Sequence, residues 1–121
     1  MVPMNDFLLF NAAVDANGAV TAPFPMGLQN NAVSITLTVI SGTTGASGVN
    51  PMQVQFSNDG VSWSASTTVN VTGFDSKAGP TYVAGGTGVL TTSIPRLARI
   101  VFKGPASGYC IVNLSASPCR L

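Results

Sequence analysis

Apolar and polar residues alternate along two segments of the chain, residues 32–41 and 52–57. In a β-strand successive side chains point to opposite faces, so a period of two predicts strands with one buried and one exposed face. No segment shows an apolar period of 3.6 residues over three turns, and no helix is therefore predicted. The buried faces are expected to carry Val33, Ile35, Leu37 and Val39 in the first segment, and Met52, Val54 and Phe56 in the second.

Glycine and proline interrupt the rest of the chain every 8–15 residues or so, and the runs between them are rich in strand-forming Val, Ile, Thr and Phe. Residues 73–88 contain several glycines and are expected to form a long loop with one short strand at Thr81–Ala84. Pro118 is expected to end the last strand. The predicted strands are Phe7–Val14, Ala19–Phe24, Ala32–Ser41, Met52–Ser57, Ser66–Thr72, Val89–Ile94, Arg96–Phe102 and Tyr109–Ala116.

About eight strands in 121 residues predict an all-β protein made of one domain, residues 1–121. Eight antiparallel strands in two sheets fit a β-sandwich, either a jelly roll or a related Greek key. The segment Met1–Asp6 precedes the first strand and contains Pro3. We expect this segment to be an N-terminal arm that reaches a neighbouring subunit. Residues Met1–Phe10 contain no Lys or Arg, and Asp6 lies where a basic region would be expected, so no secretory leader is expected.

Charge is scarce: the chain has five basic and four acidic residues, 7% in total, against about 25% in an average soluble domain. It has no histidine and no glutamate, so general acid–base catalysis, a nucleophile triad and most metal sites lack their commonest groups, and a carboxylate pair would have to come from the four aspartates. We expect no enzyme, no catalytic or metal residues and no cofactor. The centres of protein interfaces are depleted in charge, so a charge-poor surface favours a subunit of an assembly over a Ser/Thr-rich free monomer.

The net charge of +1 provides no field that would attract nucleic acid or an anionic membrane, and neither is expected as a partner. Arg96, Arg99 and Lys103 lie within eight residues on or beside one predicted strand. They are expected to form either a solvated edge or a polar contact to an acidic neighbouring subunit. The two cysteines, Cys110 and Cys119, are either packed as free thiols or joined in a disulfide, and the sequence leaves both alternatives open.

The most specific motif is a turn followed by a tryptophan: Ser57, Asn58, Asp59, Gly60 and, three residues later, Trp63. Asn and Asp side chains bond to nearby backbone and start turns, and glycine accepts a positive φ. Trp63 is expected to pack over the turn or in the core, with stacking on a sugar as the alternative.

In its context this motif resembles a class of small virion proteins of tailed bacteriophages. The resemblance also includes Leu8–Ala13, Thr21–Pro25, the strand around Ile35–Val39, and Arg96–Phe102 leading into Gly104. It implies a jelly-roll or sandwich subunit that decorates or cements a capsid, often as a homotrimer. The turn alone also resembles a hairpin of discoidin-type binding domains, but those are longer and usually carry a disulfide joining their ends.

The expected function is therefore that of a non-enzymatic virion protein that binds the major capsid protein and stabilises the capsid lattice. Its expected location is the capsid surface, after assembly in the host cytoplasm. The alternative is a receptor- or glycan-binding module of a phage tail or fibre, which would use Trp63 or Tyr82 for stacking. The interface residues expected for the first function are Met1, Val2, Pro3, Met4, Arg96, Arg99 and Lys103.

Overall fold

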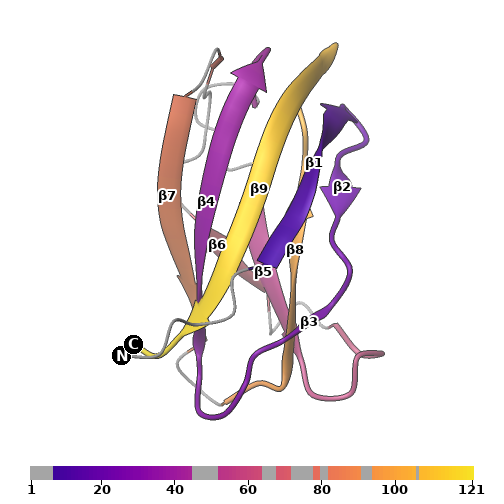
Figure 1. Cartoon of the computed structure of the whole chain (residues 1–121). Helices are drawn as coiled ribbons and strands as arrows, with labels where there is room; N and C mark the ends of the chain where they lie inside the picture. The colour runs from indigo at the N-terminus through magenta and orange to yellow at the C-terminus, as the bar shows by residue number, and fades with distance from the viewer. Residues whose placement is uncertain are drawn as a thin grey trace.

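The computed structural model describes residues 7–44, 52–63, 68–71, 78–79, 82–90, 94–105 and 107–121. In these residues the chain forms nine strands and no helix, and the strands make two antiparallel sheets that face one another (Figure 1). The strands are β1 (Phe7–Asp15), β2 (Ala19–Val20), β3 (Phe24–Pro25), β4 (Ala32–Ser41), β5 (Met52–Ser57), β6 (Thr68–Val71), β7 (Tyr82–Val89), β8 (Leu97–Phe102) and β9 (Tyr109–Cys119).

The first sheet has the strand order β1-β9-β4-β7, and the second has the order β2-β8-β5-β6, with β3 also paired to β8. Because β2 and β3 lie on the same edge of β8, they act as one interrupted strand. Counting them once gives eight strands in the orders 1-8-3-6 and 2-7-4-5, which is the arrangement of a jelly roll. The prediction of an antiparallel all-β sandwich with about eight strands is confirmed.

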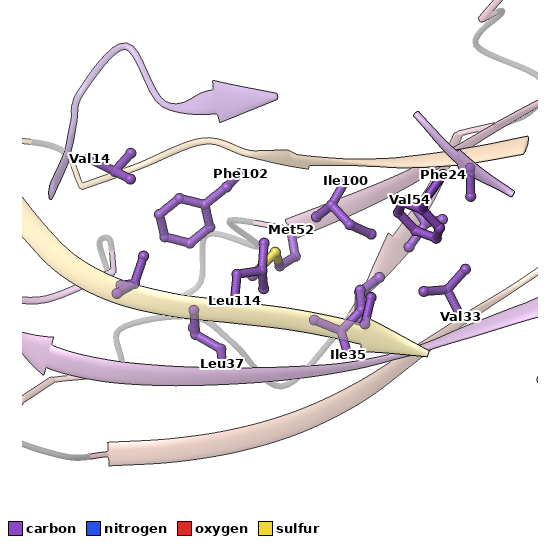
Figure 2. Packing of buried hydrophobic residues seen from close by; sticks show 14 of the residues in the cluster. Val14, Phe24, Val33, Ile35, Leu37, Met52, Val54, Ile100, Phe102 and Leu114 are labelled. Carbon is purple, nitrogen blue, oxygen red and sulfur yellow. The ribbon is translucent and has the colours of Figure 1, made fainter. Parts of the chain in front are cut away.

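The core fills the space between the two sheets, as Figure 2 shows for side chains that point toward one another from both layers. The alternation read from the sequence holds in β4 and β5, where the apolar residues expected to be buried are all fully buried. In β8 the inner residues are Ala98, Ile100 and Phe102. Two facing layers of this kind are the basic solution for burying one apolar face of each sheet.

Strand β7 differs from the prediction. Residues 82–88 were expected to be mostly loop and Val89–Ile94 a strand, but the strand is Tyr82–Val89 and it pairs with β4 along its whole length. Leu90 follows the strand, and residues 91–93 lie outside the described residues. Gly85, Gly86 and Gly88 had been interpreted as loop residues, although they lie in the strand. Gly88 is a packing residue, since a Cβ there would lie 2.6 Å from Cγ2 of Val54 in the other sheet.

Strand β9 also runs further than predicted, through Pro118 to Cys119. The backbone oxygen of Cys119 accepts a hydrogen bond from the N–H of Asn31, which continues into β4. Backbone groups of successive strand residues point to opposite sides, so the backbone nitrogen of Pro118 points away from β4. On that side of β9 the pairing with β1 has already ended, at the pair of Phe7 with Ala116. The missing N–H of Pro118 therefore removes no bond of the ladder, and proline is tolerated there.

The predicted strand Ala19–Phe24 is split in two around Thr21. The N–H of Thr21 donates to the backbone oxygen of Ile100, and its hydroxyl oxygen accepts from the N–H of Ile100 at 2.9 Å. The side chain thus satisfies a backbone donor of β8 at the point where the edge strand is interrupted.

The two cysteines cannot form a disulfide with each other. Cys110 and Cys119 lie nine residues apart on the single extended strand β9, so their Cα atoms are about 30 Å apart, whereas a disulfide needs roughly 4.4–6.8 Å. Cys110 is buried and Cys119 partly buried. Burial raises the pKa of both thiols.

Candidate interaction surfaces

The predicted turn motif closes the end of β5 through one carboxylate and one hydroxyl. Oδ1 of Asp59 accepts hydrogen bonds from the N–H groups of Val61 and Ser62, both at 2.9 Å, and from the hydroxyl of Ser57 at 3.0 Å. The Ser57 oxygen in turn accepts from the N–H groups of Asp59 and Gly60. Gly60 has a φ of 77°, the left-handed conformation that the motif predicted.

These bonds stabilise the ionised form of Asp59. The backbone N–H groups of Ser62 and Val61, followed by the Ser57 hydroxyl, lower the pKa of Asp59 from its ordinary value of 3.8 to about 2. Asp15 has a similar local role, because its Oδ1 accepts from the N–H of Asn17 at 2.9 Å in the β1–β2 turn. The carboxylates of both aspartates are therefore used to hold turns.

Trp63 packs over the turn and joins it to the outer face of the second sheet. Its Nε1 donates to the backbone oxygen of Gly60 at 3.2 Å, and the guanidinium carbon of Arg99 lies 4.3 Å from the ring centroid. Arg99 also donates from Nε to Oε1 of Gln55 at 2.7 Å, and the two residues are paired in register on β8 and β5. Arg99 is thus held against the outer face of the second sheet by a stacking contact and a hydrogen bond.

The three predicted interface cations do not gather into one patch. Arg96 and Lys103 are exposed and lie just before and just after β8, about 20 Å apart along the strand. The backbone N–H of Arg96 donates to Oδ1 of Asn58, which ties this residue to the turn motif. The predicted interface residues Met1, Val2, Pro3 and Met4 lie outside the described residues.

The outer face of the first sheet is nearly free of charge, and sequence reasoning did not single it out. The strands of this sheet contain one charged residue, Asp15 at the end of β1. Hydroxyl and amide side chains sit opposite one another across β4 and β9: Ser34 with Ser117, Thr36 with Ser115, and Thr38 with Asn113. A shallow hollow of about 300 Å³ lies over this face. Such a surface can meet another protein without desolvating an ion.

A second surface is a groove of about 560 Å³ between the end of β1 and the segment 18–22, which we call the edge groove. Most of its lining residues are small or apolar, but Asp15 and Thr21 also line it, and Val20 and Tyr109 on it are 56% and 62% exposed. The alternation of apolar and polar residues along the chain could not predict this groove, because the groove forms between segments that belong to different sheets.

Two further findings concern all of the described residues. The described residues contain no group of three or more histidine, cysteine or acidic side chains placed to hold a metal ion. Within these residues there is also no helix of the length and apolar character needed to cross a membrane.

No known family model matches the sequence, and no curated protein matches it. Among solved structures, the chain is similar to the SPBc2 prophage-derived protein YomS, with a TM-score of 0.51 and 10% identity over 96% of this chain and 93% of that one. It also matches a chain from Bacillus endospore appendages, described as disulfide-linked pili, with a TM-score of 0.45 and 13% identity over 98% and 88% of the two chains.

A third similar structure is the catalytic domain of a GH87 alpha-1,3-glucanase bound to nigerose. Its TM-score is 0.43 and its identity 19%, over 92% of this chain but only 22% of the glucanase chain. At such identities the similarity to the prophage protein concerns the fold alone.

Proposed function

We propose that this protein is a non-enzymatic structural subunit of a phage particle that binds the capsid lattice as a cement or decoration protein. The observation that carries the proposal is the outer face of the first sheet, which has hydroxyl and amide rows and almost no charge. Desolvating this face costs less than desolvating a charged one, so contact with a capsid protein can be favourable across the whole face.

Two further points support the structural role. The jelly-roll arrangement is common among viral capsid proteins, and the prophage-derived protein with the similar fold is consistent with a phage origin. The two described aspartates, Asp15 and Asp59, hold turns, and the sequence lacks histidine, the commonest catalytic base, which supports a non-enzymatic role. The proposed partners are the major capsid protein and further copies of this chain, as a homotrimer, on the capsid surface after assembly in the host cytoplasm.

Binding to capsids tests this function. Capsids of the phage or prophage whose genome carries the chain, produced without it, would be mixed with the purified protein and sedimented. We expect co-sedimentation and a higher disruption temperature of the capsid. Thr36→Lys places a charge in the proposed contact face and should weaken binding at least about tenfold, since an unpaired buried charge costs several kcal/mol.

Ser62→Lys is the matched control, because it adds the same charge at an exposed position in the turn motif, away from the first sheet. It should bind like the unmodified protein. Failure of the unmodified protein to sediment with capsids, or equal binding by Thr36→Lys, would overturn the proposal.

A glycan-binding role is less well supported. The guanidinium of Arg99 already occupies one face of the Trp63 ring, which leaves at most the other face for stacking on a sugar. Loss of host-cell binding by a folded Trp63→Ala variant would nevertheless favour a tail or fibre module over a capsid protein.

A further inference from the structure

The edge groove lies beside a strand edge that is open to pairing. β1 pairs with β9 on one side, and within the described residues no strand pairs with its other side. β1 is nine residues long and contains no proline or basic residue, and its one charge, Asp15, lies at its end. Long edges without such protection are sites where another strand adds.

The opposite wall of the edge groove offers no long edge with which another strand could pair. The segment after β2 contains Pro23 and Pro25, and the edge strand is interrupted at Thr21. An added strand would therefore pair with β1 and direct alternate side chains into the groove. The walls leave room for them, since Ala12, Ala19, Ala22 and Gly18 line it.

The chain itself contains a segment of the right chemistry. The first four residues, Met1–Met4, are all apolar and contain two long, adaptable methionines. In an extended conformation Val2 and Met4 point to one side, and their backbone groups share one edge. Pro3 then turns its ring nitrogen to the other edge, where the missing N–H removes no bond to β1.

A chain cannot place this segment in its own edge groove. If the chain reversed at Asn5 and Asp6 in a two-residue turn, Met4 would lie opposite Phe7, and Met1 would reach no further along β1 than Asn11, even with the irregularity between Leu8 and Phe10. The groove begins beyond this point, at Ala12. The segment must come from another copy of the chain to reach it.

We propose that residues Met1–Met4 of one copy add as a short strand to the free edge of β1 in a second copy, with Val2 and Met4 in its edge groove. Four extended residues span about 13 Å, which matches the four residues of β1 that line the groove, 12–15. This inference deepens the self-association in the proposed function, but it requires no capsid.

The test measures the mass of the chain in solution by light scattering at about 0.1 mM, where weak association is populated. The unmodified chain should form oligomers, whereas a variant that lacks residues 1–6 should be monomeric. Val20→Arg places a charge in the groove and should weaken association at least about tenfold. Val61→Arg is the matched control, since Val61 is also an exposed valine, 83% exposed, but lies in the turn motif.

A synthetic peptide with the sequence Met-Val-Pro-Met-Asn-Asp gives an independent measurement. It should bind the variant that lacks residues 1–6 and shift the amide resonances of 12–15, but should not bind once Val20→Arg is added. A monomeric unmodified chain, unchanged association without residues 1–6, or equal effects of the two arginines would overturn the proposal. Failed capsid sedimentation with intact self-association would overturn the capsid role alone.

Discussion

Gly88 shows at the residue scale why one position of a strand must lack a side chain. A Cβ at this position would lie 2.6 Å from Cγ2 of Val54 and 3.3 Å from Cγ2 of Val71, both buried in the second sheet. We expect Gly88→Ala to lower the free energy of unfolding by about 1–3 kcal/mol, the usual cost of overpacking a core. Urea denaturation measures this change.

Gly85 on the same strand is the matched control. It is exposed, and a Cβ there would meet only the backbone oxygen of Ile35, at an ordinary 3.8 Å. Gly85→Ala should change the free energy of unfolding by less than about 0.5 kcal/mol. Equal losses from both substitutions would contradict the role of the contact between the sheets, since strand propensity alone favours alanine over glycine.

Asp59 gives the fold a defined dependence on pH. Its pKa is lowered from 3.8 to about 2, so between these values the unfolded chain binds more protons at this carboxyl than the folded chain does. The stability it contributes is therefore complete above about pH 4 and is lost as the pH falls toward 2. Thermal melting from pH 5 to pH 2 should fall less steeply for Asp59→Asn than for the unmodified protein, and parallel curves would contradict this prediction.

At the scale of elements, the contact between Trp63 and Arg99 fastens the turn motif to β8. A double-mutant cycle with Trp63→Ala and Arg99→Ala should give a coupling of about 0.5–1 kcal/mol, as for a partly exposed cation–π pair. The hydrogen bond from Arg99 to Gln55 is lost whenever Arg99 is replaced, with or without Trp63, so its contribution cancels in the coupling energy. Val61→Ala in place of Trp63→Ala should give no coupling, and a coupling of similar size there would point to a change in the unfolded chain.

Some strands and contacts could be predicted from the sequence, and others could not. β4 and β5 were found because a half-buried strand imposes a period of two on its residues. β7 was predicted only at its start, as Thr81–Ala84, because glycines at a sheet-to-sheet contact look identical, in sequence, to glycines in a loop. The turn motif was predicted because its bonds join neighbours in the chain, but the partner of Trp63 was not, since Arg99 reaches it only through the register of β8 and β5.

At the scale of the whole molecule, no disulfide within the chain holds the two sheets together. Since Cys110 and Cys119 lie on one extended strand, their thiols remain separate and the sandwich depends on its core. The melting temperature should be the same with and without a reducing agent, and both thiols should be titrated after unfolding. A reductant-dependent shift of several degrees would require a bond between chains, and electrophoresis without reductant would then show a dimer.

The jelly-roll order joins strands that are far apart in the chain, such as β1 with β9 and β2 with β8. This order places the end of β1 beside residues 18–22 and so creates the edge groove. It also sets β4 against β9, which aligns their hydroxyl and amide rows on one outer face.

The sequence by itself determined the class of fold, most strands, the geometry of the turn motif and the shortage of charge, because each depends on residue type or on neighbours within a few positions. Tertiary structure alone decided the strand order, the extent of β7, the partner of Arg99 and the separation of the two cysteines. It also decided which surfaces are open, since a groove between two sheets exists only after strands distant in the sequence have been brought together.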